Sequence, residues 1–101
     1  MELETKIKII TDEICWHFGV SENMIKVKSR HRYLCEPRQL AMHFIHKYTG
    51  LSIPKSSRLL NRHHTTLIYT NKMIDNLLTT SSTYRSKYEK IDTLIKNKIN
   101  G

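Results

Sequence analysis

The sequence contains little of what several large protein classes require. Its 101 residues include only three glycines and two cysteines. The glycines at positions 19, 50 and 101 are too scattered to form a phosphate-binding loop or a dinucleotide fingerprint, so we expect no nucleotide hydrolysis. Cys15 and Cys35 are too few for a disulfide scaffold and indicate a reduced, cytoplasmic environment.

Long apolar runs are missing as well. No uninterrupted apolar stretch approaches the roughly 18 residues that a membrane span needs. The first four residues are acidic and amphipathic, whereas a secretory signal begins with basic residues and an apolar run. With 39% hydrophobic and 26% charged residues, the composition is typical of a globular protein. We expect one folded domain over residues 1–101 and no membrane partner.

Acidic residues are scarce in the central half of the chain. Residues 23–72 contain ten lysines and arginines but a single acid, Glu36, which gives +9. Residues 1–22 contain two basic and five acidic residues, which gives −3. The whole chain carries +8, so the central block holds more than the entire net charge. Because like charges repel, a basic block of this size favours a polyanionic partner that neutralises it.

The spacing of apolar residues predicts an all-α domain of about six helices. The first helix is predicted from Leu3 to Phe18, with Gly19 as its C-terminal stop. A second helix is expected after the cap Ser21, and a third with Pro37 in its first turn and Gly50 as its end. The remaining helices are expected from Ser52 to Leu60, from His63 to Leu78, and over Tyr84, Tyr88, Ile91 and Ile95. Residues 28–35 are predicted to form a basic loop, and residues 79–83 a polar break.

Two of these segments are typical of a helix-turn-helix. A short helix over residues 52–60 is followed by a tight turn at residues 61–62 and a longer helix over residues 63–78. The longer helix begins with the polar run Arg62-His63-His64-Thr65-Thr66. In helix-turn-helix proteins the first residues of the second helix contact base edges in the major groove, and a polar start suits that role.

Four motifs in this order resemble one family. They are Lys-Ser-Arg at 28–30, Pro-Arg-Gln-Leu-Ala-Met at 37–42, Tyr-Thr-Gly-Leu-Ser-Ile-Pro at 48–54 and Arg-His-His-Thr-Thr-Leu at 62–67. Over about residues 5–97 the chain resembles the C-terminal DNA-binding domain of the bacterial replication initiator DnaA. The resemblance implies a TrpR-like helix-turn-helix fold that binds a short AT-rich duplex box as a monomer.

The resemblance also implies roles for individual residues. Arg30 matches an arginine that enters the minor groove, where an AT-rich sequence concentrates negative potential. His64 and Thr65 match residues that read bases in the major groove, and His63 is expected to read a base beside them. Phosphate contacts are expected for Lys28, His31, Arg32, Arg38, Gln39, Lys55, Arg62, Thr66 and Tyr69. In the family, the residues at the positions of His31, Arg38, Gln39 and Thr66 either contact phosphates or brace the loop.

Two departures from the family bear on function. The ATP-binding domain of a full-length initiator is absent from the sequence, so we do not expect a complete initiator. His63 replaces the family's Asp, and His46 and Tyr69 replace positions where the family often has Lys and His. An ionised Asp only accepts hydrogen bonds, whereas histidine also donates, so we expect a box altered at the base pair that His63 faces.

Two other classes of function compete with DNA binding. One is a protein-interaction module, in which Tyr84, Tyr88 and the acidic first helix contact an initiator or replisome partner. The other is an RNA-binding domain, which the lack of aromatic platforms beside the basic block disfavours.

Metal binding and catalysis are weaker hypotheses. His63 and His64 with Cys35, or His43 with His46, could suggest a zinc site. The pair of His43 and His46 has helical i, i+3 spacing, but two ligands do not define a site. No acid accompanies the central histidines to complete a catalytic set. Trp16 is predicted to pack in the core rather than to stack on bases, and both cysteines are predicted to be core or half-buried thiols.

These observations favour a sequence-specific double-stranded DNA-binding domain. We expect a regulatory role at initiator boxes or at a promoter, association with the nucleoid in the cytoplasm, and a monomer on the DNA site. We expect no enzymatic activity, no cofactor, no metal and no small-molecule substrate.

Overall fold

The computed structural model describes residues 1–29 and 31–101, and its regular structure there is helical. The helices in chain order are α1 (Leu3–Phe18), α2 (Glu22–Lys26), the 3₁₀ turn η1 (Arg32–Leu34), α3 (Cys35–Thr49), α4 (Ile53–Arg58), α5 (His64–Thr80) and α6 (Ser82–Asn100). The prediction of an all-α fold with six α-helices and a helix-turn-helix is confirmed over the described residues.

Most helix ends lie where the sequence predicts them. The Ser21 hydroxyl caps α2 by accepting from the Met24 amide at 3.2 Å, and the Ser52 hydroxyl caps α4 by accepting from the Lys55 amide at 3.2 Å. Gly19 and Gly50 end α1 and α3 with φ values of +66° and +74°. These are left-handed conformations that glycine adopts without a side-chain clash.

Two predicted boundaries are wrong. The basic loop predicted over residues 28–35 ends too late, because residues 32–34 form η1 and Cys35 begins α3. Pro37 lies in the first turn of α3, as predicted. The polar break at 79–83 shrinks to Ser81. The hydroxyls of Thr79 and Thr80 donate to the Asn76 carbonyl at 2.9 and 2.8 Å, so both residues stay in α5. Ser81 then caps α6 by accepting from the Tyr84 amide at 3.1 Å.

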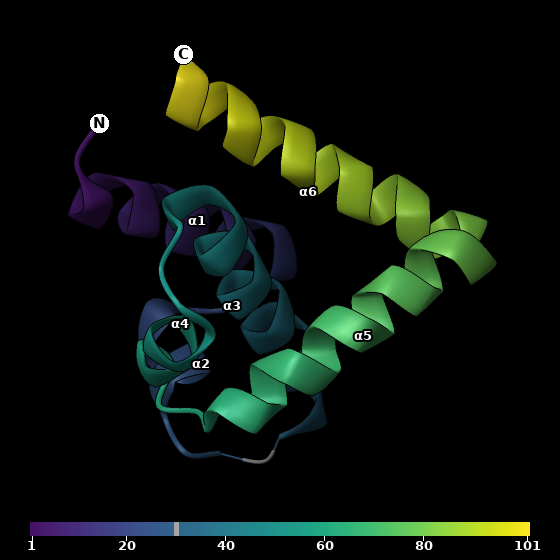
Figure 1. The fold of residues 1–101 in the computed structure, drawn as a ribbon, viewed down its shortest axis with the longest axis horizontal. Coiled ribbons are helices and arrows are strands. Elements are labelled where there is room, and N and C mark those ends of the chain that lie inside the picture. Colours follow the sequence, from purple (N-terminus) through teal and green to yellow (C-terminus); the bar gives the residue numbers. More distant parts are fainter. Residues whose placement is uncertain (30) are drawn as a thin grey trace.

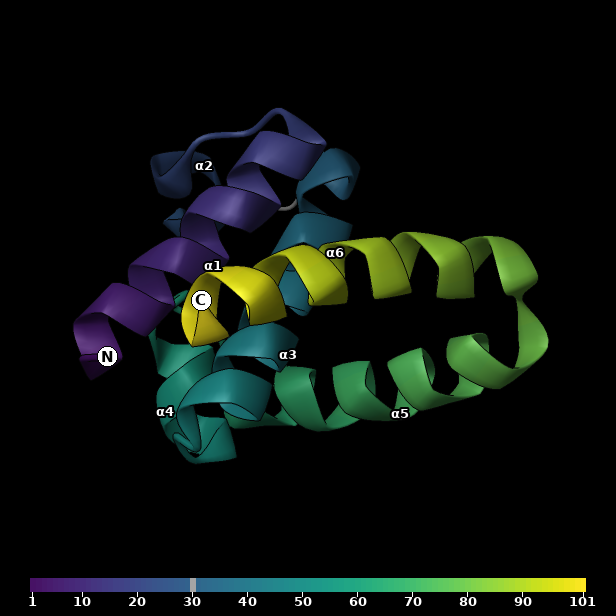
Figure 2. The ribbon, with the colours of Figure 1, turned by 90° about the horizontal axis from the view of Figure 1, so that it is seen from above.

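The core surrounds α3, which lies at the centre of the ribbon, with α5 and α6 meeting at one corner of the molecule (Figure 1). From that corner the two helices diverge (Figure 1), and α1 lies near the C-terminal end of α6 (Figure 2). Fully buried side chains come from α1, α2, α3, α5 and α6. Among them are Ile10, Ile14, Ile25, Leu40, Phe44, Ile45, Leu67, Ile74, Ile91 and Ile95. The apolar positions expected from helical spacing therefore meet in one core, which holds the helix-turn-helix against α3.

Three side chains lie elsewhere than predicted. Trp16 is 79% exposed, because it lies two residues after buried Ile14 and so points from the opposite side of α1. Leu3 is 44% exposed at the start of the same helix. Cys35 is exposed, whereas Cys15 is half-buried as expected. The prediction that Trp16 packs in the core is therefore wrong.

We expect Gly50→Ala to lower the free energy of unfolding by about 1 kcal/mol, because a left-handed alanine is strained. A Cβ at this position would meet no atom within 4 Å, so the effect isolates backbone conformation from packing. Urea unfolding measures it. Gly50→Asn is the matched control and should lose less, since asparagine adopts this conformation more readily. Wild-type stability in the alanine variant would contradict the role of Gly50 as a left-handed stop.

Candidate nucleic-acid interface

One open hollow joins the segments in which the sequence predicts DNA contacts. Its volume is about 450 Å³. The residues that line it are Lys28, Ser29, Cys35, Arg38, Gln39, Met42, Asn61, Arg62 and Thr66. They come from the basic loop, the first turns of α3, the helix-turn-helix turn and the first turn of α5. The fold thus brings together residues that are up to 38 positions apart in the chain.

Arg38 holds the edge of this hollow together. Its side chain is 95% buried, with 5% exposed, and it donates to four backbone carbonyls. The acceptors are Met24 at 3.1 Å, Ile25 at 3.0 Å, Val27 at 2.7 Å and Ser29 at 2.5 Å. A guanidinium with four of its five N–H groups engaged in this way braces α2 and the start of the basic loop. Of the two roles expected for Arg38, the structure favours bracing over phosphate contact.

The helix-turn-helix turn is attached to the same segment. Asn61 adopts a positive φ of 56°, and its side-chain amide donates to the Lys26 carbonyl at 2.8 Å. Arg62 donates to the Val27 carbonyl at 3.0 Å. The turn between α4 and α5 is therefore fixed against the C-terminal end of α2, and the position of α5 is linked to that of the basic loop.

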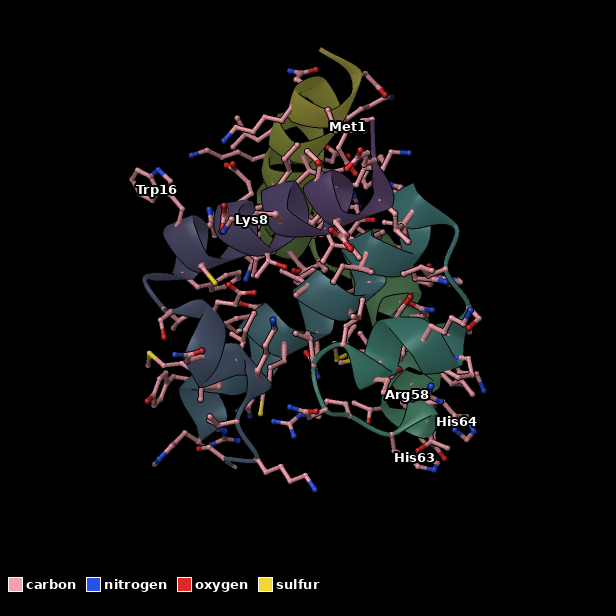
Figure 3. All side chains as sticks on the ribbon, turned by 90° about the vertical axis from the view of Figure 1, so that its left-hand side faces the viewer. Met1, Lys8, Trp16, Arg58, His63 and His64 are labelled. Carbon is pink, nitrogen blue, oxygen red and sulfur yellow. The ribbon has the colours of Figure 1, made fainter. Side chains whose placement is uncertain are left out.

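Three exposed polar side chains begin α5. His63 is the N-cap, and its Nδ1 accepts from the Thr65 amide at 3.3 Å and lies 2.9 Å from the Thr65 hydroxyl oxygen. The His63 and His64 ring centroids are 4.2 Å apart. Figure 3 shows both rings at one end of the molecule beside Arg58, far from Trp16. With Nδ1 accepting from the helix, His63 presents Nε2 as an outward donor.

The other predicted contacts divide into exposed and half-buried groups. Lys28, His31, Arg32, Lys55 and Tyr69 are exposed, whereas Gln39, Arg62 and Thr66 are half-buried. Gln39, Thr66 and Tyr69 also line a second hollow of about 480 Å³ beside the first. Arg30, predicted to enter the minor groove, lies outside the described residues.

Sequence reasoning did not single out Tyr33. It is 58% exposed in η1, and its ring stacks on His31 with centroids 5.5 Å apart. Its position beside Arg32 in the predicted basic loop could have indicated an exposed contact residue. The expectation that the basic block has no aromatic platform beside it is therefore wrong, because the exposed ring of Tyr33 is one.

The hypotheses of a protein-interaction module and of a zinc site depend on side chains that the structure places unfavourably for those roles. Tyr88 is 7% exposed and Tyr84 is half-buried, so these tyrosines do not form the expected protein-binding surface. His43 and His46 do not face a common point: His43 contacts Asn71 and Tyr88, whereas His46 Nδ1 lies 2.7 Å from the Leu51 carbonyl oxygen. Within residues 1–29 and 31–101, no three His, Cys, Asp or Glu side chains cluster as a metal site. None of the described helices has the length and apolarity needed to span a bilayer.

Comparison with known proteins gives one consistent result. The family described as bacterial dnaA protein helix-turn-helix matches residues 7–74. The chain is 30% identical over 99 residues to the chromosomal replication initiator protein DnaA of Bacteroides thetaiotaomicron, an alignment that covers 94% of this chain and 21% of that protein. For the protein of the same name from Bacteroides fragilis, the identity is 32% over 99 residues, with the same shares. For that of Caldanaerobacter subterraneus it is 27% over 93 residues, covering 92% and 21%. The chain thus spans about a fifth of the length of these relatives.

We expect Arg38→Ala to lower the free energy of unfolding by about 3 kcal/mol, because four backbone carbonyls, one buried and three part-buried, lose a charged donor. Arg38→Lys should recover little of this loss, since an ammonium cannot reach all four acceptors with the geometry of a guanidinium. Urea unfolding of both variants measures the effect. Lys55→Ala is the control, because Lys55 is exposed. Equal stability of the Arg38→Ala and Lys55→Ala variants would contradict the bracing role.

Proposed function

Since the chain belongs to the bacterial DnaA helix-turn-helix family, we propose that it binds double-stranded DNA at sites related to the family's AT-rich box. The observation that carries this proposal is the convergence of the predicted contact residues on one face. There the basic loop, the start of α3 and the start of α5 surround a common hollow. That face belongs to the block of residues 23–72, whose net charge is +9.

The start of α5 reads the major groove. His63, His64 and Thr65 are exposed at the helix terminus and carry donors, acceptors and a methyl group within reach of base edges. His63 stands where the family has Asp, and its outward Nε2 donor suits guanine O6 or N7. The preferred site therefore differs from the family's box at the base pair that His63 faces.

The basic loop supplies the minor-groove contact through Arg30. Support for this assignment comes from the segments on either side. Ser29 accepts from the buried Arg38, and η1 follows at Arg32. Exposed Lys28 and Arg32 add positive charge beside Arg30, which a narrow AT-rich groove attracts.

Phosphates lie against the hollows between the two reading elements. Lys28, Arg62, Gln39 and Thr66 line the first hollow and offer donors of medium reach. Lys55 on α4, Tyr69 on α5, and His31 and Arg32 in the loop extend the phosphate contacts along the duplex. Phosphate contacts of this kind fix position and supply most of the affinity, while base contacts supply specificity.

In the cell we propose that the chain acts in replication initiation or transcription by occupying initiator boxes or a promoter. It would bind each site as a monomer, in the cytoplasm with the nucleoid, and without ATP or another small-molecule ligand. The curated relatives are named as chromosomal replication initiators, and this chain covers 21% of the length of the first of them. We therefore assign it the recognition of DNA and not the whole initiator's activity.

Binding to duplex DNA should weaken steeply with salt. If about six phosphates are neutralised, log affinity should fall with log salt concentration at a slope of about −5, because bound counterions are released. Gel-shift titrations at several salt concentrations measure the slope, with a random duplex, a box-containing duplex and structured RNA as the three ligands. A slope shallower than about −2, or a preference for the RNA, would count against the proposal.

Base-reading and phosphate-binding residues should respond differently to truncation. We expect His64→Ala to weaken binding to the preferred site by roughly 1–3 kcal/mol and to leave binding to random duplex nearly unchanged. Lys55→Ala is the matched control and should weaken both by similar amounts. The preferred site is obtained first by selection from a randomised duplex library. Similar losses on both duplexes for His64→Ala would remove His64 from the base-reading residues.

A further inference from the structure

The side chain of His43 lies where three helices meet. It projects from α3, and its Nδ1 lies 2.9 Å from Oδ1 of Asn71 on α5. Its Nε2 lies 2.6 Å from the hydroxyl oxygen of Tyr88 on α6. The ring also packs edge-on against Tyr88, with centroids 5.5 Å apart. One imidazole therefore joins α5, the second helix of the helix-turn-helix, to both α3 and α6.

The direction of each hydrogen bond follows from its partners. The Asn71 carbonyl oxygen only accepts, so Nδ1 of a neutral His43 carries the proton and donates. Nε2 is then a bare acceptor and receives the Tyr88 hydroxyl proton. The Tyr88 oxygen in turn accepts from Lys47 at 3.5 Å, and Lys47 pairs with Asp92 at 3.0 Å. These bonds form a directed chain from Lys47 through Tyr88 and His43 to Asn71.

The bond to Asn71 lies close to the DNA-reading end of α5. Asn71 follows His64 by seven residues, which is about two turns of a continuous helix. Buried Leu67 and Ile74 hold the same helix against the core, but apolar contacts are not directional. A hydrogen bond is directional, so the Asn71 contact adds to this packing a restraint on the rotation of α5 about its axis. The side chains at the start of α5 share that rotation.

Charging His43 would reverse one bond of this chain. A protonated Nε2 donates, and the Tyr88 hydroxyl would then face two donors, His43 and Lys47, with its own proton lacking an acceptor. Desolvation lowers the pKa of His43, an effect that the bond to Asn71 opposes. The charged groups that face the ring are Lys47 on α3, Asp75 on α5 and Asp92 on α6, beside the Tyr88 hydroxyl. Since the folded-state pKa lies below the ordinary histidine value, acidification through that value weakens the folded arrangement.

We propose that His43 is a positioning residue, which while neutral holds α5 in the rotation that reads DNA. This inference rests on the proposed DNA binding and goes beyond it. It makes the discrimination between the preferred site and random duplex dependent on a side chain on α3 that does not touch DNA. Protonation of His43 would loosen α5 and reduce that discrimination.

Two variants of His43 separate positioning from simple packing. His43→Gln keeps a donor for Asn71 and an acceptor for Tyr88 but cannot be protonated in this range. His43→Leu fills similar space and has neither group. The measurement is the ratio of affinities for the preferred site and for random duplex, at about pH 7.5 and about pH 5.5, on either side of the usual histidine pKa. Because every variant keeps the same residues at the start of α5, the comparison is made between variants at each pH.

We expect His43→Leu to reduce the affinity ratio by about 5- to 10-fold at about pH 7.5, the effect of one or two lost hydrogen bonds. His43→Gln should keep the wild-type ratio and should lose less of it than wild type on acidification. Ile95→Val is a control for stability alone, since Ile95 is buried on α6 and has no polar side-chain group that could join this chain of bonds. Its ratio should stay at the wild-type value.

Nitrogen NMR of the His43 ring tests the bond directions without DNA, and a proton on Nδ1 but not on Nε2 is the expected result. A wild-type ratio in a folded His43→Leu variant, equal pH dependence of the ratio in wild type and His43→Gln, or a proton on Nε2 alone would each overturn the proposal. If the wild type does not bind duplex at all, the proposed function fails first, and this inference fails with it.

Discussion

The arrangement of the DNA-facing surface depends on one buried cation. Arg38 donates to carbonyls of α2 and of the basic loop, and Arg62 donates to one of the same carbonyls from the helix-turn-helix turn. Burying a guanidinium is unfavourable unless its donors are engaged, and here the acceptors are backbone oxygens that no helix or sheet satisfies. The carbonyls of the loop therefore depend on the arginine for their donors, and the arginine depends on these carbonyls for its acceptors. The spacing between the basic loop and the start of α5, the two elements proposed to read the grooves, follows from this mutual requirement.

The positive charge of the central block has two different uses. Part of it is structural: Arg38 is buried, and Lys47 and Arg62 are held by groups of the protein itself. The exposed part includes Lys28, Arg32 and Lys55, which form no salt bridge among the described residues. A net charge counted from sequence does not separate these uses. The exposed cations are the ones that determine how strongly salt weakens binding.

Local signals in the sequence predicted most of the fold, and the family match over residues 7–74 confirms the resemblance read from four short motifs. Ser21, Gly50 and Ser52 act within one helical turn, so their roles follow from neighbouring residues. The exposure of Trp16 also follows from local spacing, since Trp16 lies two residues after buried Ile14 on α1, and the predicted apolar face of that helix does not include it. The role of Arg38 did not follow in this way, because whether an arginine braces a loop depends on carbonyls 9 to 14 positions earlier. The bond between His43 and Tyr88 spans 45 positions and has no signature in local spacing.

The exposure of Trp16 has an optical consequence. It is the only tryptophan of the chain, and 79% of its surface is already in water in the folded protein. It also lies at the opposite end of the molecule from His63 and His64 (Figure 3). Its emission should therefore change little when the chain unfolds or when DNA occupies the start of α5. Buried Tyr88 and half-buried Tyr48, which both stack beside Phe44, are the chromophores whose signal reports the native packing.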